Sequence, residues 1–161
     1  MSRIDGVCLD GFSEPITIDD LHRNRCSGIP KSPGIYLIVR ASDSRPRFPA
    51  KSAGGWFKGK DPSYPLKVVH ENWVEGAHIM YVGKAAGQKG LKGRLCQLID
   101  FGFGKCVGHR GGRLLWHLED SEKLLVRWRT CSAVEADQDE TNAIASFKKV
   151  YGTRPYANRN K

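Results

Sequence analysis

Two short apolar runs, 34–39 and 79–83, constrain the fold of this chain most. Both are rich in β-branched and aromatic residues and have the length and alternation of strands. Alternation places Tyr36 on one face of the first run, and it places Tyr81 opposite Met80 in the second. Each run therefore predicts a strand that presents one tyrosine.

The sequence segments after these two runs predict the remaining strand of the sheet and the helices that flank it. A small-residue turn over 83–87 leads into a helix predicted over 91–100. An alternating run over 124–130 predicts a third strand, and apolar residues at three- and four-residue steps predict a last helix over 136–151. Three antiparallel strands flanked by helices give an α+β fold.

The chain of 161 residues is predicted to be a single domain, 1–161. Residues 1–33 form an N-terminal extension, with a short helix beginning near Thr17, which can cap it. Residues 41–77 form a long insertion between the first two strands. Some secondary structure is expected in it, because structureless loops of this length are uncommon in compact domains. Residues 148–161 form a basic tail.

The charge favours a polyanionic partner such as nucleic acid. The chain has 26 Lys and Arg against 17 Asp and Glu, a net charge of +9. The positive charge gathers in 84–113 and in the tail, as on a surface that follows phosphates. In the insertion, basic residues alternate with aromatic ones, and this pattern suits either nucleic-acid contact or a small core under the loop.

The sequence also argues against several classes of protein and of site. The five cysteines form no C-x-x-C pair, so neither a disulfide framework nor a zinc site is indicated, and reduced thiols are expected. The N-terminus has no signal-peptide pattern, and no apolar run approaches the roughly 20 residues of a membrane helix. The chain is expected to be soluble and cytoplasmic, without a membrane partner.

Two charged residues lie on apolar helix faces. Arg94 falls on the same side of its helix as Leu91 and Leu98, and Glu140 lies within the apolar stripe of the last helix, whereas Asp139 points elsewhere. A buried carboxylate needs a cationic partner or a metal ion. Either Arg94 and Glu140 form a structural ion pair, or they bind a phosphate and a hard divalent cation.

From residue 33 to residue 158, the order of motifs along the chain resembles that of the GIY-YIG nuclease family. The shared pattern is Gly34-Ile35-Tyr36 in one strand, Tyr81-Val82-Gly83 in the next, a following Lys, a helix with an Arg and a later helix with a Glu. The site residues that the resemblance implies are Tyr36, Tyr81, Lys84, Arg94, Glu140 and Asn158. It implies a GIY-YIG fold in which Arg94 contacts the phosphate and Glu140 binds one Mg²⁺ or Mn²⁺.

The chain departs from the family pattern at Leu98. Many members carry Tyr or His there, one helical turn after the arginine. His109, in a loop rich in glycine, is a candidate to supply the missing polar group. Arg110 and Arg113 beside it are expected to contact substrate, and His117 is expected on a helix surface.

The resemblance implies a metal-dependent DNA endonuclease, with a restriction or phage-defence role. Either Tyr36 or Tyr81 would be the general base, which requires a lowered pKa. One site cuts one strand, so double-strand cleavage would need a homodimer on DNA or two events. The alternatives are a nucleic-acid-binding module without catalysis and a nuclease subunit of a repair or mobile-element complex.

Overall fold

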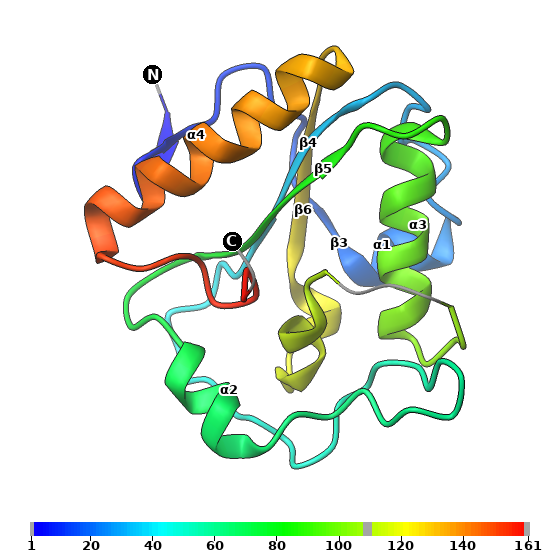
Figure 1. Cartoon of the computed structure of the whole chain (residues 1–161), viewed down its shortest axis with the longest axis vertical. Coiled ribbons are helices and arrows are strands. Elements are labelled where there is room, and N and C mark those ends of the chain that lie inside the picture. The colour runs from blue at the N-terminus through cyan, green and yellow to red at the C-terminus, as the bar shows by residue number, and fades with distance from the viewer. Residues whose placement is uncertain (1, 108–110, 160–161) are drawn as a thin grey trace.

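The computed structural model describes residues 2–107 and 111–159. Within these residues, a four-stranded antiparallel sheet in the order β3-β6-β4-β5 lies between helices, and a separate hairpin, β1-β2, lies near the N-terminus (Figure 1). The predicted α+β class and antiparallel sheet are confirmed, with one strand more in the sheet than the three predicted.

The elements have the following bounds. The strands are β1 (Arg3–Ile4), β2 (Val7–Cys8), β3 (Ile16–Thr17), β4 (Gly34–Val39), β5 (Ile79–Ala85) and β6 (Leu125–Thr130). The helices are α1 (Ile18–Arg23), α2 (Leu66–Asn72), α3 (Gly90–Gly102) and α4 (Ala133–Tyr151), with short 3-10 turns at Arg113–His117 and Ser121–Lys123. None of the described helices is long and apolar enough to cross a membrane.

Strand β4 is a central strand of the sheet, and all of its side chains are buried. Its side chains divide between two apolar clusters, one on each face of the sheet. Tyr36 and Ile38 belong to the cluster that includes residues of α1 and α3, whereas Ile35 and Leu37 belong to the cluster that includes residues of α4. The alternation predicted for this strand is therefore confirmed.

Strand β5 differs from the prediction at Met80. Ile38 pairs with Tyr81 and Val39 pairs with Ile79, so Met80 is the extra residue of a β-bulge. Met80 and Tyr81 consequently belong to the same core cluster, and the prediction that they face opposite sides is wrong. The strand also continues to Ala85, beyond the predicted end.

The N-terminal segment carries more structure than predicted. The helix at Thr17 is confirmed, because the Thr17 hydroxyl accepts a hydrogen bond of 3.1 Å from the backbone N–H of Asp20 and caps α1. Strand β3 ends at this cap and pairs with β6. Two residues are too few to show an alternating pattern, and the sequence therefore gave no sign of this strand.

The insertion contains α2, as expected, and buried polar residues anchor it. Arg40 is buried and donates to Asp120 at 3.0 Å and to the Ser44 carbonyl at 2.9 Å. His117 Nε2 accepts a 2.9 Å hydrogen bond from the backbone N–H of Tyr64, and burial lowers the pKa of His117. His117 is fully buried under the insertion, so the prediction that it lies on a helix surface is wrong.

Candidate active site

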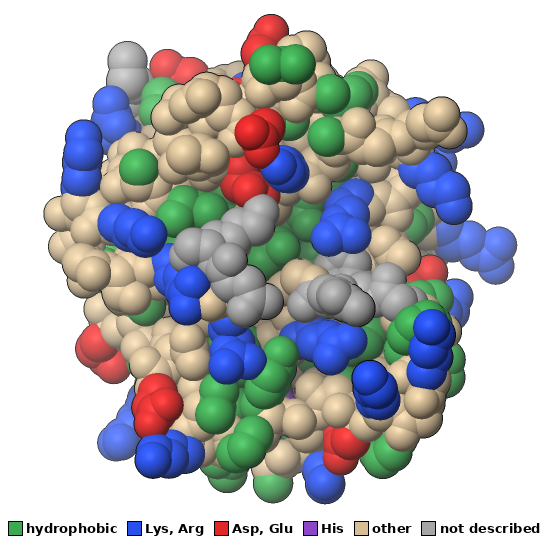
Figure 2. Space-filling view, viewed as in Figure 1, with side chains coloured by type: hydrophobic (Ala, Val, Ile, Leu, Met, Phe, Trp, Pro, Cys, Tyr) green, Lys and Arg blue, Asp and Glu red, His purple; other side chains and the backbone are tan. Residues whose placement is uncertain are grey.

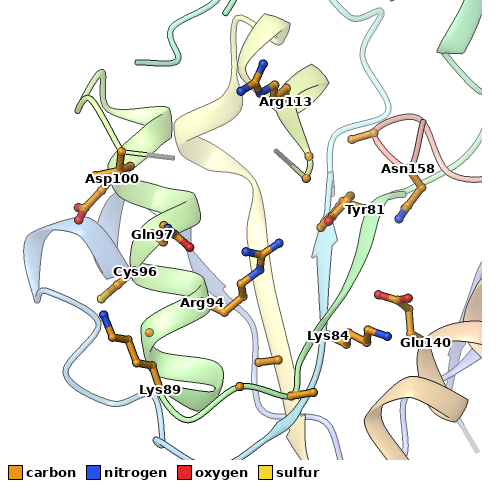
Figure 3. Close-up of a pocket in the computed structure, with 18 of the residues that line it drawn as sticks. Tyr81, Lys84, Lys89, Arg94, Cys96, Gln97, Asp100, Arg113, Glu140 and Asn158 are labelled. Carbon is orange, nitrogen blue, oxygen red and sulfur yellow. The ribbon is translucent and has the colours of Figure 1, made fainter. Parts of the chain in front are cut away.

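A cleft of about 1100 Å³ opens between α3 and α4, alongside β5 (Figure 3). Strand β5 lies at the edge of the sheet, so segments outside the sheet can approach its unpaired side. The predicted site residues that line the cleft are Tyr81, Lys84, Arg94, Arg113, Glu140 and Asn158. Tyr36 is buried and does not line it, and His109 and Arg110 lie outside the described residues.

The two tyrosines are neighbours with different access to the cleft. Tyr81 is 6% exposed, whereas Tyr36 has no exposed surface, and their ring centroids lie 6.1 Å apart. Tyr36 pairs with Gly83 across the sheet, and a Cβ at Gly83 would lie 2.3 Å from Tyr36 Cζ. The glycine of the second tripeptide therefore makes room for the tyrosine of the first.

Burial raises the pKa of both hydroxyls above the usual value of a tyrosine. For Tyr81, burial is the largest influence, the Arg94 guanidinium opposes it, and the Glu140 carboxylate adds to it. For Tyr36, burial is again the largest influence, and the pKa lies well above the usual value. The Tyr36 hydroxyl makes no hydrogen bond of normal geometry among the described residues, although Arg94 and Tyr81 lie near enough to influence its pKa.

Arg94 and Glu140 reach into the cleft from opposite walls, Arg94 from α3 and Glu140 from α4 (Figure 3). Arg94 is half-buried and Glu140 is 5% exposed, as expected for charged residues on apolar helix faces. Within the described part of the chain, no ion pair joins these two side chains, and Lys84, which also lines the cleft, pairs with Asp137. The structural alternative, an Arg94–Glu140 pair, is therefore not formed.

Lys84 is held by α4. Its Nζ donates to Oδ1 of Asp137, which lies one helical turn before Glu140. This hydrogen bond raises the pKa of Lys84, and the Glu140 carboxylate adds to the effect. Lys84 therefore carries a stable positive charge beside Glu140. The sequence did not indicate Asp137, because an exposed carboxylate on a helix has no distinguishing pattern.

Asn158 lines the cleft and also completes the hydrogen bonding of β5. Its Oδ1 accepts from the Val82 N–H at 2.9 Å, and its Nδ2 donates to the Val82 carbonyl at 2.8 Å. The neighbouring Ala157 N–H donates to the Met80 carbonyl at 2.8 Å. The C-terminal segment thus covers the edge strand, and Asn158 holds β5 in place. Its predicted substrate contact stays a prediction.

Gly111, shortly before the 3-10 turn Arg113–His117, lies close to Tyr81. Val107 and Gly111 line the cleft, and a Cβ at Gly111 would lie 2.3 Å from the Tyr81 hydroxyl. Arg113 also lines the cleft, with its guanidinium 5.6 Å from the centre of the Phe101 ring. Leu98 is fully buried in the core, so α3 presents no polar group at that position.

Two further residues line the cleft that no local sequence pattern indicates. Tyr64 from the insertion and Arg159 from the tail both line the cleft, and the Arg159 guanidinium lies 4.5 Å from the centre of the Tyr64 ring. The charged residues lining the cleft are Lys84, Lys89, Arg94, Arg113 and Arg159, with Asp100 and Glu140. Figure 2 shows Lys and Arg side chains gathered around a hollow with apolar side chains in it. The cleft is therefore basic and suits an anionic ligand.

One carboxylate of the cleft, Glu140, is a candidate ligand for a metal ion. The described residues contain no cluster of three or more His, Cys, Asp and Glu side chains, as a zinc site would need. Glu140 is a nearly buried carboxylate in the cleft wall. Mg²⁺ and Mn²⁺ prefer oxygen ligands, and Mg²⁺ commonly binds through one or two carboxylates while keeping several waters. Glu140 therefore fits a hydrated, hard divalent cation.

Comparison with known proteins assigns no family. No protein-family model matches the chain, and neither a curated protein nor a solved structure matches it. The function therefore has to follow from the residues of the cleft.

Proposed function

We propose that this protein is a metal-dependent endonuclease that hydrolyses phosphodiester bonds in DNA. The observation that carries the proposal is the meeting of four groups in one basic cleft: the Tyr81 hydroxyl, the cations of Lys84 and Arg94, and the Glu140 carboxylate. Phosphodiester hydrolysis needs this combination, which is a group to activate water, positive charge for the phosphate, and a ligand for a divalent cation.

In this proposal, two cations hold the scissile phosphate. The planar guanidinium of Arg94 can contact two phosphate oxygens at once. Lys84 offers a second positive charge in a position fixed by Asp137. Arg113 and Arg159, further along the lining, would contact neighbouring phosphates of the same strand.

Glu140 would hold the divalent cation, Mg²⁺ or Mn²⁺. When bound, such a cation stabilises negative charge on the phosphoryl and leaving oxygens. Burying a carboxylate costs several kcal/mol unless positive charge compensates it, roughly as for other buried ions. The charge of Lys84 beside Glu140 supplies part of this compensation.

Tyr81 is the better candidate for the general base. It lines the cleft, whereas Tyr36 is fully buried. The positive charge of Arg94 favours the deprotonated form of Tyr81, as a base requires, and opposes the effect of burial. Tyr36 would then position Tyr81 and fill the space above Gly83.

A relationship to the GIY-YIG nucleases is part of the proposal. Its support is that the two tripeptides lie on paired strands and that Tyr36 of one packs on Gly83 of the other. A restriction or phage-defence role is also part of the proposal, and it rests on this resemblance alone.

Incubation of supercoiled plasmid with the purified protein tests the proposal. We expect nicked circles in Mg²⁺ or Mn²⁺ and none in EDTA. If no metal-dependent nicking occurs at any salt concentration, the chain by itself is not a nuclease. Retardation of DNA in a gel without any nicking would favour the non-catalytic binding module.

The variant Glu140→Gln tests the metal ligand. It should reduce nicking at least about 100-fold, because a neutral amide is a poor ligand for Mg²⁺, while DNA binding in EDTA persists. Glu135→Gln is the matched control, since it makes the same change on the exposed face of α4. A melting temperature lowered with DNA binding lost would show instead that Glu140 is structural.

A further inference from the structure

Two aromatic residues of the insertion, Trp56 and Phe57, belong to neither core cluster. Phe48, Tyr64 and Trp73 pack against the larger core cluster, but Trp56 is 53% exposed. A single exposed apolar side chain is common on protein surfaces and needs no explanation by itself. The way in which the chain holds Trp56 and what surrounds it are less ordinary.

The backbone before Trp56 is fixed against the C-terminal end of α3. The Gly55 N–H donates to the Phe101 carbonyl at 2.8 Å, and the Ala53 N–H donates to the Trp116 carbonyl at 3.0 Å. A Cβ at Gly55 would lie 1.9 Å from the Lys105 carbonyl oxygen, so only glycine permits this approach. The indole is therefore presented to solvent from an anchored backbone.

The residues after Trp56 form a tight turn that carries two lysines. The Lys60 N–H donates to the Phe57 carbonyl at 3.1 Å, and φ is positive at both Lys58 (54°) and Gly59 (72°), as in a type I′ turn. A lysine is rarely found at positive φ. The Nζ of Lys58 lies 5.4 Å from the centre of the Phe57 ring. The segment 56–60 is thus a short, ordered tip with both aromatic and basic side chains.

The two lysines of the tip differ from their basic neighbours in having no carboxylate partner among the described residues, and Lys58 lies against the Phe57 ring instead. The nearby Lys51 and Lys105 are engaged, with Asp61 at 3.3 Å and Asp100 at 3.6 Å. In the part of the chain that the structure describes, neither Lys58 nor Lys60 has an acidic partner. An exposed indole followed by a turn that carries two lysines suits a nucleotide, because the base stacks on the ring and the cations meet phosphates.

The backbone that leads into the tip is bonded to Phe101, next to the residues at one end of the cleft. Phe101 accepts the hydrogen bond from Gly55, and the guanidinium of Arg113 lies over the Phe101 ring. Arg113 and Asp100 line the cleft at the end away from Lys84 and Glu140 (Figure 3). A strand whose phosphate lies near Arg94 could therefore extend past Arg113 toward Trp56.

We propose that the segment 56–60 binds an unpaired nucleotide of a DNA strand that lies in the cleft. Trp56 stacks on the base, and Lys58 and Lys60 contact the phosphates on either side. In duplex DNA each base face is covered by its neighbours, so the inference predicts a preference for DNA with an unpaired segment beside the cleavage point. It rests on the proposed function for the occupancy of the cleft by DNA but not for hydrolysis.

Fluorescence titration in EDTA tests the inference without cleavage. A single-stranded oligothymidine and a blunt duplex of the same length are titrated against the wild-type protein and against Trp56→Ala, Trp56→Phe and Val150→Ala. Val150 is the control, because it is 54% exposed at the C-terminal end of α4. Far-UV circular dichroism and thermal melting verify the fold of each variant.

We expect Trp56→Ala to weaken binding of the single strand about 10-fold, and binding of the duplex less than about 2-fold, from the stacking energy of one base on one aromatic ring. Trp56→Phe should retain most of the affinity. The double variant Lys58→Ala, Lys60→Ala should lower the salt dependence of single-strand binding by about one to two phosphate contacts. Unchanged single-strand affinity in Trp56→Ala, or an equal loss for duplex, would overturn the inference.

The two proposals fail separately. If plasmid is never nicked but single-strand affinity depends on Trp56, hydrolysis is wrong and the stacking site stands. If plasmid is nicked and Trp56→Ala binds single strands as tightly as the wild type, the stacking site is wrong and the nuclease stands. Should Trp56→Ala fail to fold, the lysine variant decides the question, since an unchanged salt dependence of single-strand binding would overturn the inference.

Discussion

Among single residues, the pair Tyr36 and Tyr81 shows how burial divides two similar side chains. Tyr36 has a buried hydroxyl without a well-formed hydrogen bond among the described residues, which costs roughly 1–3 kcal/mol in other proteins. Tyr81 keeps its ring in the core and lines the cleft. The same core thus supports a packed tyrosine and one that can meet a ligand.

The pH dependence of cleavage should report Tyr81 if it is the base. Its pKa is raised, so only a small fraction is deprotonated near neutral pH, and that fraction grows tenfold with each pH unit. The charged groups that face it are Arg94 and Glu140, and Lys84, whose own pKa is raised, stays protonated over the same range. The logarithm of the initial nicking rate should therefore rise with a slope of about 1 between roughly pH 6 and pH 9.

Two variants sharpen this measurement. Tyr81→Phe should abolish nicking at every pH while the protein stays folded. Tyr36→Phe should lower the rate and keep the slope, because the nearby Tyr36 hydroxyl lowers the pKa of Tyr81 but does not itself line the cleft. A rate independent of pH in the wild type, or cleavage that survives in Tyr81→Phe, would remove Tyr81 from the role of base.

Helix periodicity explains which site residues the sequence could predict. Arg94 and Glu140 were found because a charged residue within an apolar stripe is visible from three- and four-residue spacing alone. Tyr64 and Arg159 meet only through tertiary structure, and no local pattern links them. His117 was placed wrongly for the same reason, since the insertion that buries it lies far away in the sequence.

Among the elements, β5 supplies two residues of the site, Tyr81 and Lys84. The bulge at Met80 turns Tyr81 to the face of α3, and the strand continues far enough to place Lys84 against α4. Neither feature follows from the alternation of side chains. A bulge depends on the partner strand, and the end of a strand depends on what its last residues contact.

Gly83→Ala tests the fit between the two tripeptides. The new methyl group would overlap the fully buried ring of Tyr36, and we expect the free energy of unfolding to fall by about 1–3 kcal/mol, as for other overpacked cores. Urea denaturation followed by circular dichroism measures this change. Gly28→Ala is the control, because a Cβ at Gly28 would meet nothing within 4 Å. Equal stability of both variants would show that Tyr36 can move aside.

Asn158→Ala separates a positioning role from substrate contact. The substitution leaves the buried N–H and carbonyl of Val82 without partners, which should lower the free energy of unfolding by about 2 kcal/mol or more. Asn142→Ala, on the exposed face of α4, should change it by less than about 0.5 kcal/mol. If Asn158→Ala instead keeps full stability and only raises KM for DNA, Asn158 is a substrate contact.

At the scale of the whole molecule, the insertion and the C-terminal segment complete the cleft. Arg40 and His117 fix the insertion to the body of the protein, and Ala157 and Asn158 fix the C-terminal segment to β5. Tyr64 of the insertion and Arg159 of the C-terminal segment then line the cleft together with Arg94 of α3. The net charge of +9 predicted an anionic partner, but only the fold shows that so much of this charge faces a single cleft.

Buried tyrosines also set how the whole protein responds to alkali. Burial raises the pKa of Tyr36, Tyr81 and Tyr156, so the folded protein keeps these protons at pH values where the unfolded chain has lost them. Their contribution to stability is therefore complete below about pH 10 and is lost as the pH rises above that value. Burial of the Cys26 thiol, whose usual pKa is 9.0, acts in the same direction from about pH 9.

We expect the free energy of unfolding to stay nearly constant from about pH 7 to pH 9 and then to fall by more than about 1.4 kcal/mol per pH unit, the slope of a single group. Urea denaturation with reductant present, repeated from about pH 7 to pH 11, measures it. Tyr156→Phe should be less stable at neutral pH, because it loses the 2.8 Å hydrogen bond to the Leu114 carbonyl, but should fall less steeply in alkali. A free energy of unfolding that stays constant up to pH 11 would contradict this expectation, because it would mean that these hydroxyls ionise in the folded protein. Exposure to the cleft would explain the ionisation of Tyr81, but not that of Tyr36 or Tyr156.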